Sequence, residues 1–274
     1  MRGLTRSWLK HYAAAQADFS EAIRIRDGIS CFYVDRAHVN HELHEYAAAA
    51  ADLTRAMEFG ATQPRVYLDR SRAYAALGNT RAAAAEVRVA FQLPPRDYQD
   101  WAARGRALKD SDPAAAIVDF DRALELNPTS QTVLFQKALV LAKKMWRTDD
   151  AVLVLDRAIK IDGRYAPMYA ARALMYARRG EWAQAREDLT RCRLRDEDVR
   201  TWYLAAGVYS LLSSEQPADR ANALKYLRLA LQAGCDLGDV ETDRDFELIR
   251  NDPEFRRLLE NTAVRKRGES GSDL

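Results

Sequence analysis

Apolar residues recur along this chain at the three- and four-residue spacing that places them on one face of an α-helix. Within residues 166–199, Tyr169 and Tyr176 share a face of one such segment. Ala185 and Leu189 share a face of a second segment, and a glycine separates the two. The pattern predicts a pair of amphipathic helices joined by a turn. Because one hairpin cannot bury its own apolar face, we expect neighbouring hairpins to stack on it.

This hairpin is the unit of an internal repeat. One alanine column advances in steps of 34, 34, 33, 35, 34 and 38 residues, and a second column follows seven residues later with the same steps. The first column is Ala15, Ala49, Ala83, Ala116, Ala151, Ala185 and Ala223, and the second is Ala22, Ala56, Ala90, Ala123, Ala158, Cys192 and Ala230. Small side chains let stacked helices approach closely, so the columns predict the packed face.

The unit length and the residues at fixed places in it resemble the tetratricopeptide repeat (TPR) family. That family pattern has aromatic, small and aromatic residues in the first helix, then alanine, a large apolar residue and alanine in the second. Two units carry it most fully: Tyr67, Ser71, Tyr74, Ala83, Val87, Ala90 and Pro95, and then Trp101, Gly105, Leu108, Ala116, Phe120, Ala123 and Pro128. The resemblance covers residues 1 to about 236. It implies an all-α protein: a right-handed α-solenoid of helix–turn–helix repeats that binds a peptide or protein segment in its concave groove.

The repeat phase sets the expected boundaries. Arg2 and Gly3 match Arg104 and Gly105, so the chain opens inside a first helix and residues 1–29 form a partial repeat, mainly its second helix. This opening has three interpretations: Met1 is an internal start, the chain is the distal piece of a longer polypeptide, or the first helix is degenerate and frays. Six complete repeats follow, at about 30–63, 64–97, 98–131, 132–165, 166–199 and 200–236.

The carboxyl-terminal part has no counterpart in the repeat. Asp252 followed by Pro253 has the form of a helix N-cap with proline at the first helical position, and we expect residues 237–262 to cap the array. Residues 263–274 are expected to be a disordered tail. The run YLRLALQAG followed by DRDFELIRNDPEF resembles the end of planctomycete-type bacterial TPR regions attached to serine/threonine protein kinases. This resemblance implies a kinase domain, in cis or in trans, outside this chain.

Arginine and carboxylate residues occur together from repeat to repeat. An arginine in the first helix is matched by an acidic residue 15 or 16 positions later, on the facing second helix. The five pairs are Arg2 with Asp18, Arg36 with Asp52, Arg70 with Glu86, Arg104 with Asp119, and Arg172 with Asp188. Two repeats lack both partners, because Ala138 faces Val154 and Ala205 faces Tyr226. Joint presence and joint absence predict structural ion pairs, for which a bidentate guanidinium is well suited.

Charge and cysteine content narrow the function class. The 42 Lys and Arg nearly balance the 40 Asp and Glu, leaving +2 in 274 residues, so we expect no nucleic-acid partner. No apolar run is long enough for a membrane span, and no secretory signal is visible. Cys31, Cys192 and Cys235 are odd in number and widely spaced, which favours neither a disulfide framework nor a zinc site. These features predict a cytoplasmic protein without a membrane partner.

No catalytic motif is present. The chain lacks a kinase glycine-rich loop, an H-R-D loop, D-F-G, a P-loop and G-x-S-x-G. His38, His41 and His44 lie close together in sequence, but H-E-L-H-E has three-residue spacing where a zincin needs four. His38 and His41 are candidate metal ligands, and ordinary surface histidines are the favoured interpretation. We therefore expect no enzyme activity, no cofactor and no metal.

By phase, the first helices present basic residues to the concave groove, with Asp35 and Asp69 toward the amino end. These basic residues are Arg72, Arg106, Lys109, Lys137, Lys143 and Lys144. A cationic strip favours acidic peptides or carboxyl termini, while a solvated face is the simpler interpretation. The sequence predicts a non-catalytic scaffold that binds a peptide or protein segment. The alternative is the regulatory or substrate-recruiting portion of a bacterial serine/threonine kinase whose catalytic domain lies elsewhere.

Overall fold

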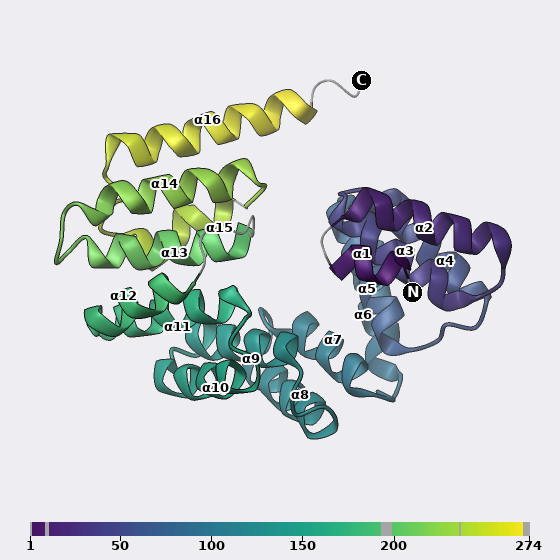
Figure 1. Ribbon diagram of the computed structural model, residues 1–274. Coiled ribbons are helices and arrows are strands. Elements are labelled where there is room, and N and C mark those ends of the chain that lie inside the picture. The colour runs from purple at the N-terminus through teal and green to yellow at the C-terminus, as the bar shows by residue number, and fades with distance from the viewer. Residues whose placement is uncertain (1, 9–10, 193–198, 236, 271–274) are drawn as a thin grey trace. The chain divides into compact units, whose positions relative to one another are not determined.

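The computed structural model describes residues 2–8, 11–192, 199–235 and 237–270. Figure 1 labels its helices, and no strand occurs in these ranges. The chain divides into two compact units, Met1–Val133 and Leu134–Leu274. The predicted all-α fold of paired helices is confirmed. In the described ranges, no helix is both long and apolar enough to cross a membrane.

The first unit consists of consecutive helical hairpins. Its helices are α1 (Arg2–Trp8), α2 (Tyr12–Ile25), α3 (Ser30–Glu42), α4 (Tyr46–Glu58), α5 (Pro64–Ala76), α6 (Thr80–Gln92), α7 (Tyr98–Leu108) and α8 (Pro113–Leu126). Each odd-numbered helix packs on the next, and α2 and α4 also pack on the first helix of the following hairpin. Local signals set the ends: the Asp112 side chain accepts a hydrogen bond from the Ala115 amide at 3.0 Å, and Pro113 opens α8.

The second unit continues the pattern and adds a cap. Its helices are α9 (Gln131–Lys144), which starts at the end of the first unit, α10 (Thr148–Ile161), α11 (Ala166–Arg178), α12 (Trp182–Arg191), α13 (Val199–Leu212), α14 (Asp219–Gln232), α15 (Leu237–Thr242), the short 3₁₀ helix η1 (Arg244–Phe246) and α16 (Pro253–Ser270). Gly180, at φ +74°, follows α11 in the left-handed region that glycine adopts without strain.

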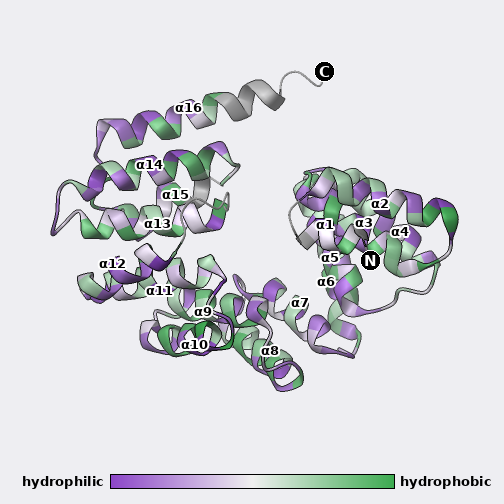
Figure 2. Ribbon diagram, viewed as in Figure 1, coloured by the Kyte–Doolittle hydropathy of each residue, from purple (hydrophilic) through white to green (hydrophobic). Residues whose placement is uncertain are grey.

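The alanine columns lie where the repeat phase places the packed face. All seven residues of the first column are buried, each on the second helix of its hairpin. In the second column Ala56, Ala90, Ala123, Ala158, Cys192 and Ala230 are buried, and Ala22 is half-buried. Figure 2 shows hydrophobic and hydrophilic residues interspersed along the helices. Close approach of the helices at these positions explains why the repeat retains small side chains there.

The carboxyl-terminal segment covers the last hairpin. Val240, Phe246, Ile249 and Phe255 are buried in one cluster with residues of α13 and α14. The Asp252 side chain accepts a hydrogen bond from the Glu254 amide at 2.7 Å at the start of α16.

Helix α16 continues to Ser270, into the segment 263–274 that the sequence predicts as a disordered tail; the disorder itself stays a prediction. Residues 271–274 of that predicted tail lie outside the described residues.

Candidate functional site

The arginines of the repeat join two hairpins. Arg36 on α3 donates two hydrogen bonds to Asp52 on α4, at 2.8 and 2.6 Å. A third, at 3.1 Å, goes to the Ser20 hydroxyl on α2 of the preceding hairpin. The guanidinium fork therefore holds the facing helix of its own hairpin and the neighbouring hairpin together.

Two further arginines repeat this arrangement. Arg70 bonds to Glu86 at 2.8 Å and to the Thr54 hydroxyl at 3.0 Å. Arg172 makes two bonds of 2.7 Å to Asp188 and one of 2.6 Å to Asp156. The acceptor on the preceding hairpin lies sixteen residues before the arginine in all three cases. The sequence pattern predicted the partner after each arginine but not the one before it, although the same sixteen-residue spacing separates them.

The remaining predicted pairs depart from this geometry. Arg104 lies 3.4 Å from Asp119 without a hydrogen bond and stacks over the rings of Trp101 and Phe91, at 5.0 and 5.2 Å. The residue sixteen positions before Arg104 is Arg88, a cation that cannot accept a hydrogen bond.

At the amino end, the side chain of Arg2 lies outside the described residues, and Asp18 accepts two bonds of 2.9 Å from Arg6. Where both partners are replaced, Ala138 and Ala205 are buried without a charge.

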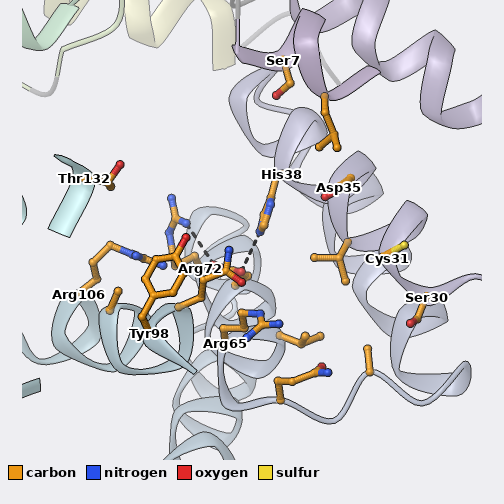
Figure 3. A pocket seen from close by; sticks show the side chains of 18 of the residues that line it. Ser7, Ser30, Cys31, Asp35, His38, Arg65, Arg72, Tyr98, Arg106 and Thr132 are labelled. Carbon is orange, nitrogen blue, oxygen red and sulfur yellow. Dashed lines mark hydrogen bonds and ion pairs between the residues drawn. The ribbon is translucent and has the colours of Figure 1, made fainter. Parts of the chain in front are cut away.

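A cavity of about 580 Å³ lies within the first unit (Figure 3). Its walls come mainly from the first helices α3, α5 and α7, with contributions from α1, α2 and the start of α9. Apolar side chains line part of it, among them Val34, Val66 and Ala102. The charged side chains that line it are Asp35, His38, Arg65, Asp69, Arg72 and Arg106. A cavity with apolar walls and a few convergent charges has the form of a binding site.

His38 and Asp69 form the central ion pair of this cavity. The His38 Nε2 atom lies 2.9 Å from Asp69 Oδ2. The His38 side chain is 51% exposed. Partial burial lowers the pKa of its imidazole, but the hydrogen bond to Asp69, together with the negative charges of Asp69 and Asp35, raises that pKa above its ordinary value. Burial alone raises the pKa of Asp69, yet the hydrogen bond and charge of His38, together with the charges of Arg106 and Arg72, bring that pKa down to about 2. Asp69 is therefore ionised at neutral pH, bound by His38 and further attracted by the charges of Arg72 and Arg106.

Arg106 lines the same cavity without such a partner. In the described part of the chain, its guanidinium makes neither a hydrogen bond nor an ion pair within 4.0 Å, and burial lowers its pKa. Arg72 reaches Asp69 only at 3.4 Å and is half exposed. Figure 3 shows Arg72, Arg106 and Tyr98 converging on one end of the cavity.

The other charges of the cavity add little to this positive end. Arg65 is held by two carboxylates outside the cavity lining, those of Asp97 at 2.7 Å and Asp100 at 3.0 Å. Burial raises the pKa of the Asp35 carboxyl. Among the described residues, Arg72 and Arg106 are the guanidinium groups of the cavity that have no carboxylate within 3.0 Å.

The six basic residues predicted for the groove are divided between the two units. Arg72 and Arg106 line the cavity of the first unit, whereas Lys109 is exposed, 3.9 Å from Asp110. Lys137, Lys143 and Lys144 belong to the second unit. Of these, Lys143 bonds to Asp243 of the same chain at 2.8 Å. Repeat phase gives the face of a helix, but it does not show which charges are neutralised by residues far away in sequence.

The comparisons with known proteins identify a fold. No family model and no curated protein matches the chain. Human IFIT1, solved as a dimer with PPP-AAAA, aligns over 93% of this chain and 68% of its own, with a TM-score of 0.63 and 13% identity. PilF of Pseudomonas aeruginosa aligns over 86% and 99%, with a TM-score of 0.56 and 15% identity. PilW, a type IV pilus biogenesis factor, aligns over 81% and 98%, with a TM-score of 0.56 and 19% identity. The chain thus has the all-α fold of tetratricopeptide repeat proteins.

Proposed function

We propose that this protein is a non-catalytic interaction scaffold whose first unit binds a protein segment through a carboxylate. The observation that supports this proposal is the Arg106 guanidinium, which lines the cavity with no ion-pair partner in the described part of the chain. The carboxylate comes from an acidic side chain or a carboxyl terminus of the partner. Arg106 and Arg72 hold it, and the Tyr98 hydroxyl, which lines the cavity, is available as a further donor.

An anion gains more here than at an open surface. Arg106 is already partly desolvated, so a bound carboxylate recovers the interaction that the guanidinium lost with water. A hydrogen bond to a charged group contributes roughly 1.5–3 kcal/mol, equivalent to a change in affinity of about tenfold or more. The apolar wall formed by Val34, Val66 and Ala102 suits the side chains that flank the acidic group in a peptide.

The first test measures anisotropy of a fluorescein-labelled peptide with a free, acidic carboxyl terminus, titrated with the full chain. An amidated peptide with asparagine and glutamine in place of the acidic residues is the matched ligand control. We expect the acidic peptide to bind at least about tenfold more tightly. Arg106→Ala should remove this preference. Arg81→Ala changes the charge equally, at an exposed position of α6 outside the cavity, and should leave binding unchanged.

Equal binding of the acidic and neutral peptides, or equal loss in the two arginine variants, would reject the proposed site. IFIT1 was solved with PPP-AAAA, so a 5′-triphosphorylated oligonucleotide serves as a competing anion in the same assay. Arg106-dependent binding of that oligonucleotide in preference to the acidic peptide would assign the cavity to a phosphate ligand instead.

The kinase relationship remains a second proposal, supported by the sequence resemblance of the carboxyl-terminal segment. Under it, the scaffold recruits substrates for a serine/threonine kinase domain in cis or in trans. Reading the coding sequence upstream of Met1 tests the cis arrangement directly. An in-frame kinase domain supports it, and a stop codon without such a domain removes it.

A further inference from the structure

Residues 243–246, Asp-Arg-Asp-Phe, pack on the second unit. They contact α9, α11 and α13, which are the first helices of its three hairpins. They form η1 and the residue before it, between α15 and α16. Side chains of α9, α11 and α13 each bind an acidic residue of this segment, across separations of 100, 67 and 40 residues. A short segment of the chain therefore occupies the same kind of surface on which the first unit carries its cavity.

The Asp243 carboxylate accepts a capping bond of 3.1 Å from the Asp245 amide and is held by two donors from other helices. Its Oδ2 atom lies 2.8 Å from Lys143 Nζ on α9 and accepts a hydrogen bond of 2.6 Å from the Tyr203 hydroxyl on α13. Lys143 Nζ also lies 4.8 Å from the centre of the Tyr203 ring. The ammonium and the hydroxyl are thus fixed relative to one another by their own cation–π contact, and together they form a carboxylate receptor.

Asp245 is held by a bidentate guanidinium. Arg178 on α11 donates two bonds of 2.8 Å to its two carboxylate oxygens. A third bond of 3.0 Å from Arg178 to the Ala142 carbonyl fixes the orientation of the fork. Gly207 on α13 makes room, because a Cβ there would lie 3.3 Å from Asp245 Cβ. The receptor for Asp245 is accordingly shaped as well as charged.

Phe246 fills an apolar slot beside these two receptors. Its side chain is fully buried, with ring centroids 5.5 Å from Tyr203 and 6.1 Å from Phe255. Aromatic packing of this kind adds to the free energy of area burial. The segment therefore makes three separate contacts with the second unit. Asp243 binds Lys143 and Tyr203, Asp245 binds Arg178, and Phe246 fills the apolar slot.

We propose that this face of the second unit is a recognition site for an acidic-x-acidic-aromatic protein segment, and that residues 243–246 are its built-in occupant. A partner segment of the same chemistry binds there by displacing them. The proposal uses Lys143, Arg178 and Tyr203 of the second unit, and it does not depend on the proposed function of the first-unit cavity. A tethered ligand competes at an effective concentration on the order of millimolar, so the wild-type chain should bind an external segment weakly.

The test uses a fluorescein-labelled peptide with the chain's own residues 240–251, VETDRDFELIRN, titrated with the full chain. The variant D243N/D245N weakens the internal occupant and leaves the receptor intact. We expect it to bind the peptide at least about tenfold more tightly than the wild type does. Adding Arg178→Ala to that variant should abolish the gain, whereas adding Arg191→Ala, at an exposed position of α12, should not.

A peptide with asparagine at both acidic positions should show no gain in any variant. Circular dichroism checks that D243N/D245N folds, and the single variant Asp243→Asn, which keeps the Arg178–Asp245 pair, should give an intermediate gain. Equal affinity of a folded variant and the wild type would overturn the proposal. So would a wild-type dimer by light scattering that becomes monomeric in D243N/D245N, because the occupant would then come from a second copy.

Discussion

At the scale of single residues, the arginine pairs differ in geometry, and the difference has a measurable consequence. Arg36 grips Asp52 with two short hydrogen bonds, whereas Arg104 approaches Asp119 at 3.4 Å without one. Double-mutant cycles to alanine, followed by urea unfolding, should give a coupling free energy of about 2 kcal/mol or more for the first pair. The second pair should give less than about 1 kcal/mol, because Arg104 is held mainly by aromatic rings.

Exposed pairs set the baseline for this comparison. Arg122 and Glu125 form a surface pair at 2.9 Å on α8, and their coupling should be near zero to 0.5 kcal/mol. If the Arg36–Asp52 coupling equals this surface value, the pair does not stabilise the stack.

The His38–Asp69 pair predicts a pH dependence of stability. The pKa of His38 is raised above its ordinary 6.5, so its contribution is present below pH 6.5 and is lost as pH rises through the raised value. The pKa of Asp69 is lowered from 3.8 to about 2, so its contribution is present above pH 3.8 and is lost as pH falls toward 2. The stabilising window therefore lies between about pH 4 and 6.5.

His38→Gln should lower the free energy of unfolding inside that window and much less at pH 9, when urea unfolding is compared at pH 5 and pH 9. His11→Gln, at an exposed position before α2, is the matched control and should not reproduce the pattern. A loss for His38→Gln that is the same at both pH values would show that protonation of the imidazole is not involved.

At the scale of helices, Gly105 allows α7 and α8 to pack closely. A Cβ at this position would lie 2.8 Å from Phe120 Cε1 and 3.1 Å from the Ala116 carbonyl oxygen. Alanine normally stabilises a helix interior relative to glycine by about 1 kcal/mol. Here Gly105→Ala should instead lower the free energy of unfolding, by roughly 1–3 kcal/mol, because the helices must separate. Thermal unfolding measures it, and a rise in melting temperature would contradict this packing.

Helix phase was predictable from sequence because it is repeated. Ala49 and Ala151 lie in the same buried column because the same contact recurs in every hairpin. The segment after α14 has no repeated counterpart, so its contacts with Lys143 and Arg178 left no periodic signal. The sequence also could not predict that Arg106 lacks an ion pair within 4.0 Å in the described residues, because this depends on the pairing of Asp69 with His38.

At the scale of the whole molecule, stacked repeats confine the effect of a substitution. Each hairpin contacts mainly its sequence neighbours, so the stability of such an array is approximately a sum of local and nearest-neighbour contributions. Leu53 on α4 and Leu227 on α14 are both almost fully buried, but they lie in different units. Truncation of either to alanine should remove about 2–5 kcal/mol locally.

Hydrogen exchange followed by mass spectrometry distinguishes local from global destabilisation. Leu227→Ala should speed exchange in α13, α14 and α16, which pack around it, and leave α3 to α6 protected as in the wild type. Leu53→Ala should give the reverse pattern, because its cluster lies on α3, α4 and α5. If either substitution accelerated exchange evenly along the chain, the two units would unfold as one cooperative body. An even response would also mean that the internal occupant, residues 243–246, could not leave its receptor without unfolding the first unit.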